Sequence, residues 1–514
     1  MKKILGRVLI VIPALAVQIG WWILTIDILD ELVRGHLGDI IEILFSLLAV
    51  FFIARLIARR DESSYKLLWV LVIATSPVLG AILYFTLGNK TTGKKLKKKL
   101  TAESKELHTL YDGERLKDTG YLDQIESGDK RIGQTLSFIS ESTGFPVFKN
   151  DTSKYYPFGE DMFADMCEDL KKATDFIYVE YFIIESGKFW DTLTDIMAEK
   201  AKEGVDVRVM YDDLGSIATY SAADIKVLSK KGIKCIPFNP FFMIKSQLNN
   251  RDHRKLMVID GEVAYSGGVN LADEYINETH PYGRWKDIGF RVTGMAVESY
   301  TYMFAEFWNA FSKNKIPDDV LKRVAESEKQ SADNGFILPY YDSPMRDEHT
   351  SNILFTEILS TATDYVWFYT PYLILGDALY DAFIRAGRRG VDVRIIMPGI
   401  PDKKMVYRLS RSYYEDLLKA GVKIYEYTPG FVHAKAFIAD DKIAGIGTVN
   451  LDYRSLFLHF ECSSVFYKAD IIDDLKKDYL NSLEECNERH LEDINRNPVH
   501  KMIDSFLRVI APLL

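Results

Sequence analysis

The chain has few cysteines and no excess of positive charge. Its cysteines lack the Cys-x-x-Cys or Cys-x-x-His spacing of zinc ligands, and they are Cys167, Cys235, Cys462 and Cys486. No structural zinc site is therefore expected, and reduced, mostly buried thiols of a cytosolic domain are the ordinary interpretation. The formal net charge of −9 over 514 residues disfavours a nucleic-acid binder, because binding a polyanion usually requires a basic surface.

Charged residues are also missing from stretches near the N-terminus. Residues 8–26 and 67–87 contain none, and residues 40–58 contain only Glu42 and Arg55. About twenty apolar residues span the core of a bilayer, so we expect residues 1–90 to be a membrane anchor of two to three hydrophobic helices. A cleaved signal peptide is the alternative for the first stretch, but no small-x-small cleavage site follows it.

The charges that flank these stretches predict the orientation in the membrane. Lys2, Lys3 and Arg7 favour a cytoplasmic N-terminus, and the lysines within residues 90–99 favour a cytoplasmic location for the rest of the chain. Since both ends of the third stretch have basic flanks, that segment could also be kinked or re-entrant, and the number of full spans stays open. Residues 91–134 are expected to be a basic linker and connecting segment.

Beyond residue 130 the sequence repeats itself. Ala-Thr-Asp at 173–175 recurs at 362–364, and Gly-Val-Asp-Val-Arg at 204–208 recurs at 390–394. Each copy alternates apolar strand-like runs with helical stretches, which is typical of an α/β unit with a largely buried sheet. The period is too long for a solenoid. We therefore predict a duplicated domain with halves at residues 135–333 and 334–514.

Each copy carries the same short motif. The two sets are His253, Lys255, Asp260 and Asn270, and His433, Lys435, Asp440 and Asn450. Each asparagine follows its histidine by 17 residues, and the histidines are 180 residues apart. Residues i and i+2 of a strand point to one face, so each histidine should project beside its lysine. The aspartates have the opposite parity, which predicts a turn or structural role.

Two histidines and two lysines in one site suit phosphoryl transfer. A neutral imidazole can attack phosphorus and form a phosphohistidine, while a protonated one gives its proton to the leaving alkoxide. Lysine and asparagine donors would meet the charge on the non-bridging oxygens, so no metal or other cofactor is expected. The candidate catalytic residues are the motif members His253, Lys255, Asp260, His433, Lys435 and Asp440, with Asn270 and Asn450 as candidate substrate-binding residues.

The paired motifs resemble the HKD signatures of the phospholipase D superfamily. Within it, the chain is similar to the bacterial cardiolipin synthase family in the membrane segment at 77–88, the sequence GTVNLDYRSL at 447–456, the following Phe460-Glu461 and the closing Ala-Pro-Leu-Leu. The resemblance implies an α/β fold. It would be a duplicated phospholipase D-like α/β sandwich with pseudo-twofold symmetry, preceded by N-terminal transmembrane or membrane-associated helices.

The resemblance also implies roles for single residues. His253 would be the nucleophile and His433 the general acid and base. Relatives place a carboxylate some way after each histidine to hold its tautomer. The matching candidates are Asp287, which lies 34 residues after His253, and Glu461, which lies 28 residues after His433.

Two more residues are candidates for substrate binding or orientation. Many superfamily members have Ser or Thr two residues before the asparagine, a position that Thr448 fits and Gly268 does not. Arg251 could bind an anionic substrate near the site entrance, or it could be an ordinary solvated charge.

The implied reaction converts two phosphatidylglycerol molecules into cardiolipin and glycerol, and phosphatidylethanolamine is an equally compatible donor. A hydrolase that passes the phosphatidyl group to water, a nuclease and an inactive membrane scaffold are the alternatives. The acidic charge and the membrane stretches disfavour the nuclease, and two complete motifs disfavour the scaffold. The expected partners are anionic phosphatidylglycerol and the bilayer, without nucleic acid. The expected location is the bacterial cell membrane, as a multi-pass protein with its catalytic domain on the cytoplasmic side.

Overall fold

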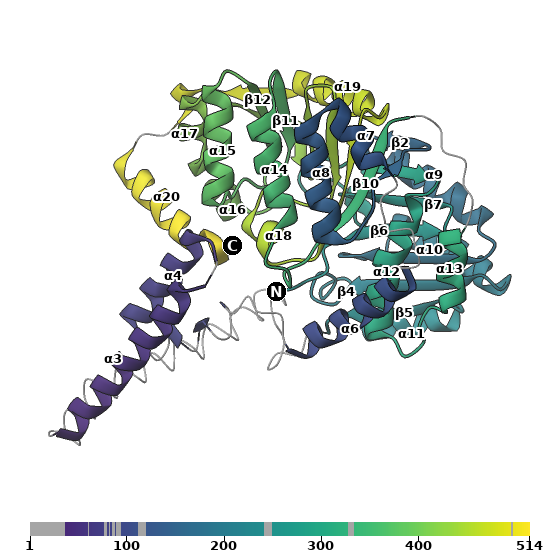
Figure 1. The fold of residues 1–514 in the computed structure, drawn as a ribbon, viewed down its shortest axis with the longest axis horizontal. Helices are drawn as coiled ribbons and strands as arrows, with labels where there is room; N and C mark the ends of the chain where they lie inside the picture. The colour runs from purple at the N-terminus through teal and green to yellow at the C-terminus, as the bar shows by residue number, and fades with distance from the viewer. Residues whose placement is uncertain are drawn as a thin grey trace. The chain divides into compact units, whose positions relative to one another are not determined.

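The computed structural model describes residues 36–513 except 60, 77–79, 82, 85–87, 89–93, 112–119, 241–248, 327–333 and 495–496. The first apolar stretch, residues 8–26, lies outside the described residues. The chain forms two compact units (Figure 1). One unit consists of Met1–Thr91 and Phe506–Leu514, and the other consists of Thr92–Ser505.

The smaller unit contains helices α3 (His36–Ile57) and α4 (Ser63–Thr75). Trp69 lies edge-on to both Tyr65 and Tyr84, with ring centroids 6.3 and 5.4 Å apart. The outer surfaces of both helices expose large apolar side chains, namely Ile43, Leu44, Leu47, Leu48, Val50, Phe51, Ile57, Leu67 and Leu71. Among the residues that the structure describes, no helix combines the length and the apolar composition needed to cross a membrane.

The first half of the larger unit is built on a seven-stranded sheet. In spatial order its strands are β2 (Ser153–Tyr156), β9 (Gly289–Thr293), β7 (Val263–Gly267), β6 (Lys255–Ile259), β3 (Phe176–Tyr181), β4 (Asp206–Asp212) and β5 (Lys234–Phe238). Strands β3, β4 and β5 run parallel, and β6, β7 and β9 are joined by antiparallel pairing. Every residue of β3 is buried, which accounts for its nearly continuous apolar run.

The second half repeats this order in a nine-stranded sheet. The strands are β1 (Phe148–Lys149), β10 (Phe336–Asp342), β17 (Glu461–Tyr467), β16 (Ile443–Gly447), β15 (Ala436–Ala439), β11 (Tyr365–Tyr369), β12 (Asp392–Pro398), β13 (Lys423–Tyr427) and β18 (Cys486–Arg489). The series from β17 to β13 matches that from β9 to β5 strand for strand, with the same parallel and antiparallel pairings. The predicted duplication of an α/β unit is confirmed.

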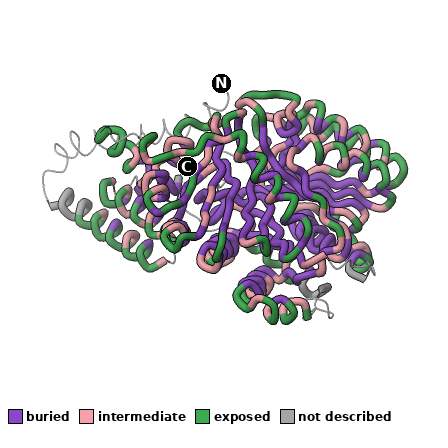
Figure 2. Tube along the Cα trace, turned by 90° about the horizontal axis from the view of Figure 1, so that it is seen from above, coloured by how far each residue is buried: buried purple, intermediate pink, exposed green. Residues whose placement is uncertain are grey.

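Helices cover both faces of the sheets. They include α9 (Gly159–Lys172), α10 (Lys188–Lys202), α12 (Val297–Phe311), α14 (Thr350–Thr361), α15 (Asp377–Arg388) and α19 (Ile471–Glu484). The others of the larger unit are α6 (Lys94–Tyr111), α7 (Tyr121–Gly128), α8 (Lys130–Thr143), α11 (Ala222–Lys230), α13 (Asp318–Glu326), α16 (Lys404–Ser412), α17 (Tyr414–Lys419) and α18 (Tyr453–Phe457). The C-terminal α20 (Pro498–Ile510) begins in the larger unit and ends in the smaller one. Buried residues concentrate in the strands, and exposed ones lie on the outer helices (Figure 2).

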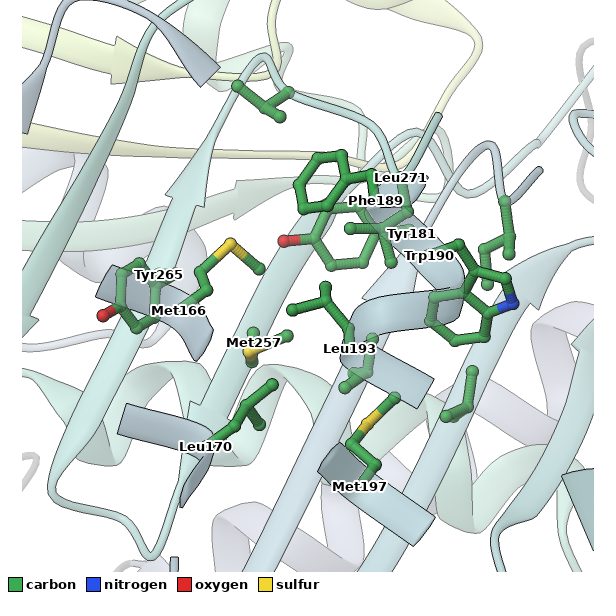
Figure 3. Packing of buried hydrophobic residues seen from close by; sticks show 14 of the residues in the cluster. Met166, Leu170, Tyr181, Phe189, Trp190, Leu193, Met197, Met257, Tyr265 and Leu271 are labelled. Carbon is green, nitrogen blue, oxygen red and sulfur yellow. The ribbon is translucent and has the colours of Figure 1, made fainter. Parts of the chain in front are cut away.

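One core lies between the first sheet and helices α9 and α10. Met166 and Leu170 of α9 and Leu193 and Met197 of α10 pack over Met257 of β6 (Figure 3). On α9 and α10, these side chains recur at helical spacing on the face turned to the sheet. The core therefore fixes β6, the strand that begins two residues after His253.

Helices α12 and α19 connect the two halves. From the first half, α12 packs on β6 and β3, and its Glu306 accepts a hydrogen bond from Tyr341 of β10 at 3.1 Å. From the second half, Asp478 of α19 accepts hydrogen bonds from Tyr155 at 2.7 Å and from Lys286 at 2.6 Å. Each half therefore contributes a helix that contacts the other half, as a pseudo-twofold arrangement requires.

The predicted linker region contains helices that pack on the larger unit. Helix α6 lies along α12, where Lys315 forms an ion pair with Glu103 at 2.9 Å. Helix α8 packs on β10 and α14, and β1 pairs with β10. Residues 130–149 thus pack with the second half, although residues 135–149 fall within the predicted first half.

The motif aspartates have a structural role, as their parity predicts. Asp260 lies in the turn after β6 and accepts backbone hydrogen bonds from Thr174, Asp175 and Phe176 at 2.7–2.9 Å. Asp440 makes the same set with residues 363–365 at 2.8–2.9 Å. Both aspartates lie at the far end of their strands from the motif histidine, so they are not part of the catalytic cluster. Their bonds explain why Ala-Thr-Asp is repeated.

We expect Asp260→Asn to lower the free energy of unfolding by about 2 kcal/mol, because hydrogen bonds to a charged acceptor each contribute roughly 1.5–3 kcal/mol. Asparagine tolerates the left-handed backbone at this position, where φ is +54°. The substitution therefore changes the charge and the hydrogen-bond acceptors of the side chain without straining the backbone. Denaturant unfolding of the purified protein measures the effect. Glu262→Gln, at an exposed carboxylate of the same turn, is the control, and equal stability of both variants would contradict the assigned role.

Candidate active site

Each motif histidine is bound through its backbone to the opposite half. The His253 amide donates to the carbonyl of Phe460 at 2.9 Å, and the His433 amide donates to the carbonyl of Lys286 at 2.7 Å. The residue before each histidine also forms a parallel bridge. Asp252 pairs with Phe460, and β14 (Gly430–Val432) pairs with β8 (Arg284–Lys286). The histidines are therefore held at the junction between the halves.

The orienting carboxylates are exchanged between the halves. His253 Nδ1 lies 2.8 Å from Glu461 Oε2, and His433 Nδ1 lies 2.6 Å from Asp287 Oδ2. The expectation that Asp287 serves His253 and Glu461 serves His433 is wrong. Phe460 and Lys286 accept the histidine amides of the opposite halves, and the carboxylates are the residues that follow them. Sequence spacing identified both carboxylates, but it could not show that their partners cross.

Burial keeps both imidazoles neutral in this site. It lowers the pKa of His253 well below its usual value, and the charge of Lys255 lowers it further. Burial and Lys435 lower the pKa of His433 to about 4, against the opposing effect of Asp287. With Nδ1 donating to a carboxylate, each Nε2 keeps its lone pair. A neutral, oriented imidazole is the form required of a nucleophile.

The motif lysines lie beside the histidines, as the spacing predicts. Lys255 Nζ donates to the His253 carbonyl at 2.7 Å, and Lys435 Nζ lies 2.7 Å from His433 Nδ1. Burial lowers the pKa of Lys255 to about 8 and that of Lys435 to about 7. The charges act across the halves, because Lys435 lowers the pKa of His253 and Lys255 lowers that of His433. The two motifs are therefore close enough to influence each other electrostatically.

The two asparagines differ in their surroundings. Asn270 Oδ1 accepts from the Ile183 amide at 3.1 Å, and its Nδ2 donates to the Tyr275 hydroxyl at 2.7 Å. Tyr275 in turn lies edge-on to His433, with ring centroids 5.3 Å apart. Asn450 donates to Asp452 at 2.9 Å, and its Oδ1 is buried without a hydrogen-bond partner among the described residues. Asn270 therefore supports the wall of the site, whereas Asn450 retains an unused acceptor.

Thr448 forms a hydrogen bond with the carboxylate of Glu461. Its hydroxyl donates to Glu461 Oε2 and accepts from the Cys462 amide at 2.9 Å. Thr448 therefore orients the group that orients His253. At the corresponding Gly268, a Cβ atom would fall 2.0 Å from Asp287 Oδ1. The first half has no room for a side chain there, because the carboxylate itself occupies the space.

Arg251 is not at the site entrance, contrary to expectation. Its side chain is 1% exposed and donates from Nε to Asp212 Oδ1 at 3.0 Å, while Nη2 donates to the Asn239 carbonyl at 3.0 Å. Asp212 also accepts from the Asp252 amide at 2.9 Å. The arginine therefore ties the end of β4 to the segment that carries His253, and it is neither a solvated charge nor a substrate ligand.

Sequence reasoning missed residues that support this segment. Arg254 is fully buried, pairs with Glu180 of β3 and stacks over Phe307 of α12, with the guanidinium carbon 3.5 Å from the ring centroid. The sequence offered one signal for this pair. Glu180 is an acidic residue inside the apolar run of β3, and a buried charge requires a partner. Over the described part of the chain, no three His, Cys, Asp or Glu side chains are grouped so that they could hold a metal ion.

Comparisons with known proteins agree with this geometry. The family profile described as "Cardiolipin synthase, PLD-like domain" matches residues 166–281 and 355–483, and that described as "Phospholipase D-nuclease N-terminal" matches residues 44–89. A protein of Streptococcus mutans described as uncharacterized is 40% identical over 448 residues, covering 87% of this chain and 96% of its own length.

Relatives with a described activity are similar along nearly the whole chain. A cardiolipin synthase of Halalkalibacterium halodurans is 30% identical and covers 94% of this chain and 95% of its own length. One of Geobacillus kaustophilus is 31% identical, with coverage of 99% and 98%. Among solved structures, phosphatidylserine synthase of Haemophilus influenzae superposes with a TM-score of 0.57 at 13% identity, covering 74% of this chain and all of its own. That likeness supports the fold.

We expect sulfate to bind between the lysines at about pH 6 and to dissociate as the pH approaches about 9. Sulfate keeps its charge over this range, whereas Lys435 and Lys255 lose theirs as the pH rises through about 7 and about 8. Affinity should fall by up to about tenfold per pH unit for each proton lost. Isothermal titration calorimetry measures it.

Lys435→Met should bind sulfate more weakly at about pH 6 and should show a shallower pH dependence. Lys234→Met removes a lysine that is partly exposed and paired with Asp206 at 2.7 Å, and it should match the unaltered protein. An affinity that stays constant between about pH 6 and 9 would contradict the lowered lysine pKa values.

Proposed function

Because this chain belongs to the cardiolipin synthase family of phospholipase D-like proteins, we propose that it transfers a phosphatidyl group from one phosphatidylglycerol to another, forming cardiolipin and releasing glycerol. The observation that carries the proposal is the crossed pairing of two buried imidazoles with two carboxylates beside two lysines. This arrangement supplies a nucleophile, an acid and base, and a positive surface for one phosphodiester.

In the first step, His253 Nε2 attacks phosphorus. A nitrogen–phosphorus bond forms, the bond from phosphorus to the glycerol oxygen breaks, and that oxygen takes its proton from His433. His253 suits the nucleophile because burial and Lys255 keep it neutral. His433 suits the acid because Asp287 raises its pKa against the effect of burial. The negative charge of the bound phosphodiester raises it further, so His433 Nε2 takes up a proton from solvent as the substrate binds, and this is the proton that the glycerol oxygen receives.

In the second step, the hydroxyl group of the second phosphatidylglycerol attacks the phosphohistidine. His433, now neutral, removes the hydroxyl proton, the new oxygen–phosphorus bond forms, and the bond to His253 breaks. Lys255 and Lys435 offset charge on the non-bridging oxygens in both steps. Water in place of the lipid hydroxyl would give phosphatidic acid, so this site accounts for both transfer and hydrolysis, and family membership favours transfer.

Membrane attachment through the N-terminal unit is part of the proposal. Residues 44–89 match an N-terminal profile of this superfamily, and α3 and α4 expose many large apolar residues. We place the protein in the bacterial cell membrane with the catalytic unit on the cytoplasmic side. The basic flank at residues 94–99 supports this orientation, because cytoplasmic segments carry an excess of lysine and arginine.

The proposal is tested with labelled phosphatidylglycerol in vesicles. We expect the purified protein to form cardiolipin and glycerol, with phosphatidic acid as a minor product. His253→Ala should abolish both turnover and covalent labelling, because it removes the attacking nitrogen. His433→Ala should label slowly and turn over little. Acid-labile label on His433 alone would reverse the two roles, and phosphatidic acid as the main product would make the protein a hydrolase.

The crossed pairing of carboxylates and histidines also predicts how two carboxylate substitutions affect the reaction of two different substrates. A p-nitrophenyl phosphatidyl ester has a leaving group that needs little help from an acid. Its burst of p-nitrophenolate therefore reports on attack by His253 alone. Asp287→Asn should slow reaction with phosphatidylglycerol at least about a hundredfold but spare the burst, because Asp287 serves the acid. Glu461→Gln should slow both, because Glu461 serves the nucleophile. The reverse pattern would show that each carboxylate acts within its own half.

A further inference from the structure

A third imidazole lies beside the nucleophile. The ring of His459 is 6.2 Å from that of His253, measured between centroids, and the two planes are tilted by 34°. His459 is partly exposed. After burial and Lys255, it is the next group that lowers the pKa of His253. The reaction proposed above assigns no role to this residue.

The backbone around Phe460 turns His459 toward the site. Phe460 forms a parallel bridge with the opposite half, where its carbonyl accepts the amide of His253. Its ring packs into the core on Phe307, with centroids 5.0 Å apart. Successive side chains of an extended segment point to opposite faces. His459 and Glu461, which flank Phe460, therefore share the face that meets the nucleophile.

The other half places a tryptophan at the equivalent position. Trp285 precedes Lys286, whose carbonyl accepts the His433 amide, just as His459 precedes Phe460. The ring of Trp285 lies 5.7 Å from that of His433. Each catalytic imidazole is thus next to an aromatic ring from the opposite half. The ring beside the nucleophile is an imidazole, which can both donate and accept a hydrogen bond.

His459 is not equipped to act as a nucleophile or as an acid. Its Nδ1 is buried and has no hydrogen-bond partner among the described residues, whereas Nδ1 of each catalytic imidazole meets a carboxylate. Burial and the charges of Arg454 and Arg251 lower the pKa of His459 well below its usual value. The ring is therefore neutral and lacks an orienting carboxylate, which leaves it the role of a hydrogen-bond partner.

The surroundings of the ring indicate which nitrogen of His459 carries the proton. A neutral imidazole has one N–H and one lone pair. A buried N–H without an acceptor is disfavoured, so we assign the lone pair to the buried Nδ1 and the proton to Nε2. Nε2–H is then the group that can donate to a ligand in the site.

The phosphodiester would use such a donor. Asn270 and Asn450 already donate to other side chains of the protein. Lys255 and Lys435 each donate to the carbonyl of the histidine in the same motif. An N–H beside the nucleophile adds a donor where the non-bridging oxygens gain charge in the transition state.

We propose that His459 Nε2–H donates a hydrogen bond to a non-bridging oxygen of the phosphodiester, beside the nitrogen–phosphorus bond that His253 forms. The inference rests on the proposed function, because it adds a substrate contact to the same reaction. His459 keeps its proton in both steps, since His433 supplies and removes the transferred proton. The hydrogen bond strengthens as the oxygen gains charge, so its loss lowers kcat more than it raises KM.

Substitutions at position 459 separate the N–H from the ring. His459→Phe keeps an aromatic ring but removes the donor, and His459→Gln keeps a donor. His349→Phe is the matched control, because His349 is also partly exposed and packs edge-on to an aromatic ring, that of Phe457. We expect His459→Phe to lower kcat for cardiolipin formation about a hundredfold. His459→Gln should lose much less, and His349→Phe should lose nothing. An unchanged kcat in His459→Phe would overturn the proposal.

A sulfur atom in the substrate tests the contact itself. Phosphatidylglycerol with sulfur in place of one non-bridging oxygen exists as two diastereomers at phosphorus. Because sulfur is a weaker hydrogen-bond acceptor than oxygen, the unaltered protein should react about tenfold more slowly with the diastereomer whose sulfur faces His459. This difference should disappear in His459→Phe and persist in His349→Phe. The same difference between diastereomers in all three proteins would overturn the proposal, whatever the loss of kcat.

Sulfate binding tests the donor without turnover. At about pH 6, where both motif lysines are charged, His459→Phe should bind sulfate about tenfold more weakly than the unaltered protein, and His349→Phe should match it. In the unaltered protein, the Nε2–H proton resonance of His459 should move downfield when sulfate binds, which needs no substitution to fold. An unmoved resonance would overturn the proposal.

These outcomes separate the inference from the proposed function. Absence of cardiolipin with the unaltered protein would refute the proposed function, while the sulfate measurements would still report on the donor. A phosphorylated adduct at His459 would instead overturn the donor role and leave the reaction itself intact.

Discussion

Two backbone hydrogen bonds between the halves determine the geometry of the site. The amides of His253 and His433 each donate to a carbonyl of the opposite half, and the residue after that carbonyl is the carboxylate that meets the imidazole. One of the contacts that join the halves is therefore also the contact that orients both histidines. Neither half contains an oriented imidazole by itself, so the duplication is a requirement of the chemistry as well as a feature of the sequence.

Burial then adjusts the proton affinities in this cluster. Removing imidazoles and ammonium groups from water disfavours their charged forms, which keeps the histidines neutral and brings the lysines close to titration near neutral pH. The helices that cross between the halves maintain this burial, with Asp478 of α19 bound to Tyr155 and Lys286. A bound phosphodiester anion would stabilise the charged forms of these lysines and histidines, which burial disfavours. The site therefore favours the binding of an anion.

Several predictions from local pattern were confirmed because they depend on neighbours in the chain. The repeated strand rhythm predicted the two sheets, and strand parity placed each histidine beside its lysine and assigned Asp260 and Asp440 to turns. The prediction for Arg251 was wrong. An arginine beside a catalytic motif is a reasonable anion ligand until the fold places Asp212 against it. No feature of residues 249–255 indicates a partner from the end of β4.

The sequence alone determined the duplicated α/β architecture, the identity of the histidines, lysines and carboxylates of the site, and the apolar character of the N-terminal region. Periodicity and motif spacing carry that information, since both arise along the chain. Only the tertiary structure decided which carboxylate serves which histidine, that Thr448 holds Glu461, and that Arg251 is internal. These contacts join residues from different strands or halves, and spacing within one copy of a repeat does not encode how two copies pack against each other.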